Sequence, residues 1–217
     1  MAATIERSEV RVGAAALAGQ LVRPVAARGV VAFVHGSGSG RASPRHRRVG
    51  TVLHDAGLAT LSFDLLHAGE AGDRRKVFDI ALLAARTVDA LDWLAEHADT
   101  AALPTGLFGA STGAAAALCA AAERPGRVRA VVSRGGRPDL ARECLAELSA
   151  PTLLIVGGND TEVLALNRDA LRAMHCRKRL EVVPGAGHLF EAPGALDAVA
   201  HLAAAWFETH LAAPAGA

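Results

Sequence analysis

The chain has 217 residues, of which 51% are hydrophobic and 21% charged, and its formal net charge is +1. This length fits one globular domain, and the apolar fraction argues against a disordered chain. The balanced charge argues against a nucleic-acid or anionic-membrane partner held by a basic field. Aromatic residues make up only 4% of the chain. A surface built on aromatic stacking, as in sugar or single-stranded nucleic-acid binding, is therefore not expected.

The cysteines and the N-terminal residues predict a soluble, cytoplasmic protein. Cys119, Cys144 and Cys176 lie far apart without the paired spacing of a metal site, so we expect reduced thiols and no bound metal. Residues 1–7 lack the apolar core of a signal peptide. The run 107–122 is too weakly hydrophobic to span a bilayer. The composition leaves open whether the protein is a monomer or a homodimer.

Predicted strands and helices alternate along most of the chain. Residues 1–28 are expected to form an antiparallel ribbon, with its strands in 9–25 and a turn near Gly13. Continuous apolar runs predict further strands, the first two buried on both faces; they lie at 30–34, 59–63, 105–108, 128–133, 152–156 and 180–183. Apolar residues spaced three and four apart predict helices; these lie at 77–97, from Pro138 to about Leu148, and at 194–211. A frayed tail is expected at 212–217.

This alternation is typical of parallel strands joined by crossover helices. The predicted fold class is α/β, with one doubly wound domain over residues 1–217 and a mostly parallel sheet of about seven to eight strands. The connection 134–150 has room for a loop and one helix, which is too little for a cap domain. We therefore expect an open, shallow site that favours small or exposed groups.

The pentapeptide Gly109-Ala110-Ser111-Thr112-Gly113 joins a predicted strand to an alanine-rich helix. A serine at the tip of such a turn is exposed as a nucleophile, and the flanking glycines let the neighbouring chain pass without a Cβ clash. The turn also directs the positive end of the helix at the site where an oxyanion would form. Taken alone, Ser111 fits an ordinary helix N-cap about equally well.

A glycine-rich loop, His35-Gly36-Ser37-Gly38-Ser39-Gly40, directly follows the predicted strand 30–34. Such a loop can present the backbone N–H of Ser37 beside that of Thr112, which predicts an oxyanion hole with two donors. The glycine spacing of a dinucleotide-binding loop is not met, because Arg41 and Ser43 stand where that pattern requires glycine.

An acid and a base follow two later strands. Asp160 comes directly after the strand 152–156, and His188 follows the strand 180–183. Since the carboxyl ends of parallel strands share one edge of the sheet, we expect Ser111, Asp160 and His188 to form a catalytic triad there. Singly, Asp160 and His188 are each better explained as turn or loop residues, and Asp64 is an alternative acid. All three residues follow strands, in the chain order Ser, Asp, His that a hydrolase triad requires, and this agreement favours the triad.

In this combination the sequence resembles the α/β-hydrolase superfamily, and within it the dienelactone-hydrolase-like branch, from about residue 30 to 211. The resemblance implies hydrolysis of a small ester substrate that carries a negative charge. The dienelactone hydrolases proper have a cysteine nucleophile, whereas Ser111 makes this chain similar to carboxylesterases. The expected function is a serine hydrolase for carboxylic esters, lactones or thioesters, and its triad mechanism requires no cofactor. The alternative is a non-catalytic protein of the same fold that binds a ligand or partner.

Three residues are candidate substrate contacts. Arg134 ends a predicted strand at the same edge of the sheet and can clamp a carboxylate, although a structural arginine that bonds loop carbonyls is slightly favoured. His35 and Arg41 flank the glycine-rich loop. Arg41 begins a basic run that continues to Arg48, and such a run is more often a solvated helix face.

Overall fold

The computed structural model describes residues 4–212 and forms one eight-stranded sheet. The strands are β1 (Ile5–Val12), β2 (Leu17–Pro24), β3 (Val30–Val34), β4 (Ala59–Phe63), β5 (Thr105–Ala110), β6 (Val128–Arg134), β7 (Thr152–Gly157) and β8 (Lys178–Val183). Their order across the sheet is β1-β2-β4-β3-β5-β6-β7-β8. Strands β3 to β8 pair in parallel, whereas β1 and β2 are antiparallel. The predicted doubly wound α/β fold without a cap domain is confirmed.

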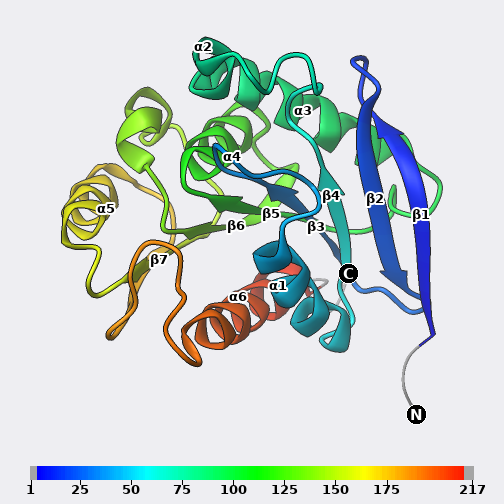
Figure 1. Ribbon diagram of the computed structural model, residues 1–217. Helices are drawn as coiled ribbons and strands as arrows, with labels where there is room; N and C mark the ends of the chain where they lie inside the picture. Colours follow the sequence, from blue (N-terminus) through cyan, green and yellow to red (C-terminus); the bar gives the residue numbers. More distant parts are fainter. Residues whose placement is uncertain (1–3, 213–217) are drawn as a thin grey trace.

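Helices cover both faces of the sheet (Figure 1). They are α1 (Pro44–Asp55), α2 (Arg74–Val77), α3 (Ile80–Glu96), α4 (Thr112–Glu123), the 3-10 helix η1 (Pro138–Cys144), α5 (Thr161–Ala173) and α6 (Ala195–Leu211). Helices α1 and α6 pack together on one face around Phe33, Phe108 and Phe207. Helices α3 and α4 pack on the other face around a larger aliphatic cluster. Within residues 4–212, no helix is long and apolar enough to cross a membrane.

The N-terminal residues form a hairpin that extends the sheet. Strands β1 and β2 pair along their whole length, starting at Ile5 rather than at the expected Glu9. The turn falls at Gly13, whose φ of +65° is the left-handed region that glycine adopts without strain. The tail expected at 212–217 lies outside the described residues, except for Ala212.

Two helices differ from the sequence-based expectation because of local capping. Helix α3 begins at Ile80 rather than at Val77, since the Asp79 side chain accepts a hydrogen bond from Leu82 N (2.9 Å) and caps it. The segment after Pro138 is a 3-10 helix that ends at Cys144, with Ala141 outside helical geometry, rather than an amphipathic helix reaching Leu148.

The expectation of three reduced cysteines is wrong for two of them. Cys119 on α4 and Cys144 at the end of η1 form a disulfide with a Cα–Cα distance of 5.1 Å, and Cys176 is the free cysteine. The partners are 25 residues apart in the sequence. They meet because η1 packs against α4. The spacing of the cysteines in the sequence does not predict this packing.

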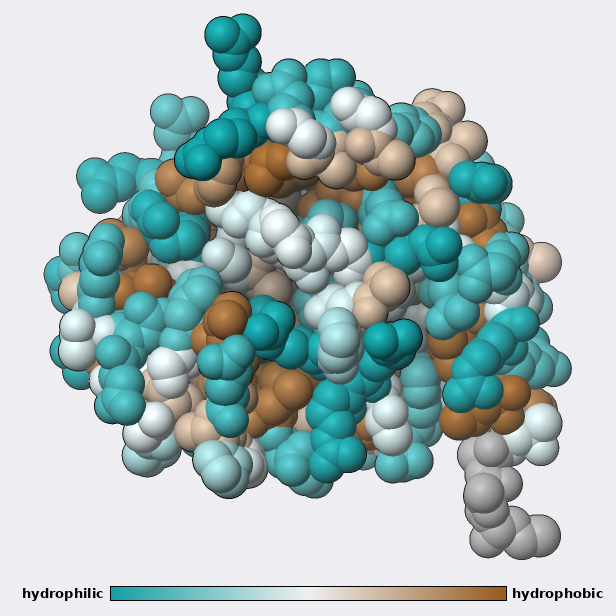
Figure 2. Space-filling view, in the orientation of Figure 1, coloured by the Kyte–Doolittle hydropathy of each residue, from teal (hydrophilic) through white to brown (hydrophobic). Residues whose placement is uncertain are grey.

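The strand order changes direction between β3 and β5, because β4 lies on one side of β3 and β5 on the other. Loops that leave the carboxyl ends of such neighbouring strands diverge and open a crevice, which is where ligands bind in doubly wound sheets. The loop after β3 carries residues 35–40, and the turn after β5 carries Ser111. Figure 2 shows the face drawn in Figure 1 hollowed near its centre, among residues of intermediate hydropathy.

Candidate active site

Ser111 lies in the sharp turn between β5 and α4, with φ 51° and ψ −122°. A positive φ is unusual for a residue with a side chain and indicates strain that the surroundings must hold. A Cβ at Gly113 would lie 2.3 Å from the carbonyl oxygens of Val34 and His35, and one at Gly109 would lie 2.5 Å from Ala114 Cα. The two glycines therefore let β3, β5 and α4 approach closely enough to form the turn.

His188 and Asp160 are hydrogen-bonded, with 2.7 Å between His188 Nδ1 and Asp160 Oδ2. Asp160 precedes α5 but makes no capping bond with its side chain, which faces His188 instead. The two loops are also joined by backbone and amide bonds, from Asn159 N to Ala186 O (2.9 Å) and from Asn159 Nδ2 to Gly185 O (3.0 Å). The bond at Nδ1 leaves His188 Nε2 as the ring nitrogen available to a nucleophile.

Ser111, His188 and Arg134 line one cavity of about 850 Å³, together with residues 36–46 of the loop after β3 and the start of α1. Within the described part of the chain, no hydrogen bond joins Ser111 Oγ to His188. Such bonds are often long in the absence of substrate and tighten in the complex. The alternative acid, Asp64, instead binds Arg41, accepting a hydrogen bond from Arg41 N (2.8 Å) and pairing with its guanidinium (3.3 Å).

Ser37 and Thr112, whose backbone N–H groups are the two expected oxyanion donors, are neighbours in space. Ser37 N donates a hydrogen bond to Thr112 Oγ1 (3.0 Å), which ties the glycine-rich loop to the first residue of α4. In this state the Ser37 N–H is therefore engaged by a hydroxyl, and an oxyanion would have to share or replace that bond.

His35 already has hydrogen-bond partners within the protein, so its place as a substrate contact stays a prediction. Its Nε2 accepts a hydrogen bond from Leu65 N (2.9 Å), so Nδ1 carries the proton that is donated to Gly36 O (3.0 Å). The acceptor role of Nε2 requires a neutral ring, and burial lowers the pKa of His35 in the same direction. Gly36 O and the N–H of Ser37 belong to the same peptide group. By binding Gly36 O, His35 therefore fixes the direction of the Ser37 N–H.

Arg41 also has partners within the protein. Besides Asp64, its guanidinium pairs with Glu9 on β1 (3.2 Å). Arg41 lines the cavity, but its charge is already balanced by two carboxylates, so the structure does not support it as a free anion ligand. The basic run that follows is not a uniformly solvated face either, since His46 on α1 is 2% exposed.

Among the described residues, Arg134 has no such partner. Its side chain is buried at the end of β6, with Nε and Nη1 unpaired, and its guanidinium lies 5.7 Å from the ring centroid of Phe190. Burial, and then the nearby charge of Arg45, lowers its pKa to about 10, so the group is still charged at neutral pH. A structural arginine would donate hydrogen bonds to loop carbonyls. In residues 4–212 the Arg134 side chain donates no such bond. The cavity therefore contains a buried cation that lacks an anion.

His46 is a cavity residue that sequence reasoning missed. Its ring stacks on Phe33 of β3 at 4.8 Å, and burial, followed by the charge of Arg134, lowers its pKa to about 3. Position 46 lies in a run of arginines, and such a run by itself indicates an exposed helix face. The burial of His46 follows only from the packing of α1 on the sheet.

The doubly wound sheet, the serine at the turn after β5, and the hydrogen-bonded acid and histidine after β7 and β8 define an α/β-hydrolase. The family model of the dienelactone hydrolase family matches residues 17–211. The chain belongs to this family.

Among solved structures, a dienelactone hydrolase from Anabaena variabilis is 55% identical, with a TM-score of 0.93, covering 97% of this chain and 100% of that one. A carboxyl esterase from Tuber melanosporum shares the fold at 20% identity, with a TM-score of 0.74, covering 97% of this chain and 88% of that one. A Mycobacterium tuberculosis protein named as a phosphoribosyl transferase is 56% identical over 96% of this chain, which corresponds to 47% of that protein. The chain thus spans about half the length of this curated relative.

Proposed function

We propose that this hydrolase-family protein is a serine hydrolase that cleaves small carboxylic esters, lactones or thioesters. The observation that carries the proposal is the bond between His188 Nδ1 and Asp160 beside the cavity that contains Ser111. The mycobacterial relative is about twice as long as the region that it shares with this chain, and its name describes that whole protein.

In the first half-reaction, Ser111 Oγ forms a bond to the acyl carbon while His188 Nε2 accepts the hydroxyl proton. Asp160 holds the imidazole in the required tautomer and stabilises the imidazolium. The backbone N–H groups of Thr112 and Ser37 would bind the negative oxygen. The bond to the leaving oxygen or sulfur then breaks, and His188 protonates that atom. In the second half-reaction, water adds to the acyl-enzyme by the same route and releases the acid and Ser111.

Arg134 supports a substrate that carries a negative charge. A buried guanidinium without a partner is costly, and an anion that binds it would recover hydrogen bonds and charge pairing. His35 and Arg41, by contrast, already have protein partners and are not part of this proposal.

The test is the substitution Ser111→Ala, with Ser149→Ala, an exposed serine before β7, as the matched control. We expect wild type and the control to hydrolyse p-nitrophenyl acetate and to be labelled by a fluorophosphonate at Ser111. The Ser111→Ala variant should lose labelling and lose at least about a thousandfold in kcat, since the nucleophile is removed. Folded wild-type protein that neither reacts with the probe nor hydrolyses short esters would refute the proposal. Ligand binding without turnover, unchanged in Ser111→Ala, would favour the non-catalytic alternative.

A further inference from the structure

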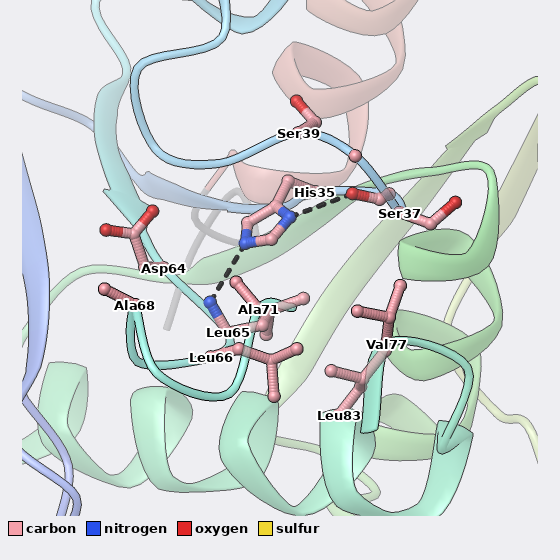
Figure 3. A pocket seen from close by; sticks show the side chains of 12 residues that line it. His35, Ser37, Ser39, Asp64, Leu65, Leu66, Ala68, Ala71, Val77 and Leu83 are labelled. Atoms are coloured by element: carbon pink, nitrogen blue, oxygen red, sulfur yellow. Dashed lines mark hydrogen bonds between the residues drawn. The ribbon is translucent and has the colours of Figure 1, made fainter. Parts of the chain in front are cut away.

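A second, smaller cavity of about 320 Å³ lies between the loop after β3 and the loop 65–76 after β4 (Figure 3). Its inner wall is aliphatic, and Figure 3 shows the side chains of Leu66, Val77 and Leu83 gathered on one side, with the hydroxyls of Ser37 and Ser39 on the other. Leu83 belongs to α3 and is buried, whereas Val77 is half-buried at the end of α2. The cavity therefore suits a compact aliphatic group.

The loop 65–76 is held in place by charge pairing. The carboxylate of Glu70 accepts two hydrogen bonds from Arg86 on α3 (2.8 and 3.1 Å) and one from Lys76 (2.8 Å). Arg86 also donates to Leu65 O (2.6 Å) at the start of the loop. These bonds hold the pKa of Glu70 well below its ordinary value. Because Arg86 ties the loop to α3 at Leu65 and at Glu70, the aliphatic wall is formed before any ligand enters.

The small cavity adjoins the proposed site along the glycine-rich loop. Residues 36–39 and Asp64 line both cavities, so the Ser37 N–H lies between them. His188 and Arg134 line only the large cavity. Since His188 must protonate the leaving atom, the leaving group has to lie on the His188 side. The acyl substituent then points the other way, along the glycine-rich loop.

From this arrangement we infer the orientation and class of the substrate: a short aliphatic acyl group lies in the cavity lined by Leu66, Val77 and Leu83, and the alcohol or thiol it is joined to carries the negative charge that Arg134 binds. This inference rests on the proposed serine hydrolase function. It distinguishes two arrangements that the resemblance leaves equivalent, since a charged substrate can carry its charge on the acyl side or on the leaving group.

The acyl side is tested with p-nitrophenyl acetate and p-nitrophenyl butyrate. Each methylene buried in an apolar pocket adds about fourfold to kcat/KM, so wild type should prefer butyrate by about tenfold or more. Filling the cavity with Val77→Phe should reduce the butyrate-to-acetate ratio to near one. Ala71→Leu, on the exposed part of the same loop, is a second variant that should shift the ratio in the same direction. Val25→Phe, at an exposed position after β2, is the control that keeps the wild-type ratio.

The leaving-group side is tested with two isomeric monoanions, butyryloxyacetate and monoethyl succinate, which carry the carboxylate on the alcohol and on the acyl side respectively. Wild type should hydrolyse butyryloxyacetate with a kcat/KM at least about tenfold higher. Arg134→Met should lower that value about 10- to 100-fold, the loss expected for one charge-assisted hydrogen-bonded contact, while ethyl butyrate is affected far less. Arg134→Lys should retain part of the preference.

The outcomes separate this inference from the proposed function. If wild type hydrolyses the esters but the chain-length ratio is unchanged in Val77→Phe and Ala71→Leu, the acyl subsite is wrong and the serine hydrolase stands. A preference for monoethyl succinate, or equal rates with both isomers, refutes the orientation in the same way. If no ester is hydrolysed and Ser111 is not labelled, the proposed function fails and this inference fails with it.

Discussion

Ser111 shows how a single residue is kept in a conformation that its own side chain disfavours. Its φ of 51° belongs to a sparsely populated region that costs on the order of 1–3 kcal/mol. The cost is borne by the surrounding packing, in which Gly109 and Gly113 allow contacts that a Cβ would prevent. In this conformation Ser111 faces the cavity, and the chain turns directly into α4.

Asp160 provides the sharpest test of the triad at the scale of single residues. In Asp160→Asn the amide can donate to His188 Nδ1, so Nε2 would carry the proton and could not accept the one from Ser111. We expect kcat for p-nitrophenyl acetate to fall by about a factor of a thousand to ten thousand, with the fold retained. Asp169→Asn, an exposed position on the same helix α5, is the control. Loss of activity in Asp64→Asn but not in Asp160→Asn would instead identify Asp64 as the acid.

The pairing of α4 with η1 matters at the scale of elements because both follow residues of the cavity. Helix α4 begins one residue after Ser111, and η1 begins shortly after Arg134. The Cys119–Cys144 disulfide joins the second half of α4 to the last residue of η1. It closes a segment that includes β6, so it restricts the unfolded chain across the centre of the fold.

Reduction of this disulfide should lower stability without removing the fold. A cross-link between residues 25 apart stabilises by about 3.5 kcal/mol in the chain-entropy view, which corresponds to roughly 7–14 °C in Tm for a protein of this size. The Cys119→Ser/Cys144→Ser variant should show this loss by calorimetry and become insensitive to dithiothreitol. Cys176→Ser is the control. Three free thiols in denatured, unreduced protein, where one is expected, would contradict the disulfide.

At the scale of the whole molecule, the sheet separates two apolar cores of different character. The core under α3 and α4 is aliphatic and alanine-rich, whereas the core under α1 and α6 contains the buried phenylalanines and His46. His46 and His54 are both on α1, and burial lowers the pKa of His54 to about 4, in the same direction as that of His46. The second core is therefore sensitive to acid.

The stability of the protein should decrease as the pH falls below about 6.5. The unfolded chain binds a proton at His46 more readily than the folded one, whose pKa is about 3, so the stabilisation is complete above pH 6.5 and is lost between 6.5 and 3. By pH 5 this residue alone should reduce the free energy of unfolding by about 2 kcal/mol. His46→Phe keeps a ring against Phe33 and should flatten the dependence of the urea midpoint on pH. His175→Gln, an exposed control, should leave it unchanged, and an unaltered slope in His46→Phe would contradict the assignment.

The parallel sheet could be predicted from the sequence, because buried strands are continuous apolar runs. The positions of Ser111, Asp160 and His188 could be predicted as well, because each follows a strand. Contacts between side chains from distant segments became known only from the folded structure. It paired Cys119 with Cys144, gave His35 and Arg41 partners within the protein, and left Arg134 buried without one. The reason is physical: strand periodicity and turn chemistry are local, whereas the partner of a buried charge or thiol is set by how helices pack on the sheet.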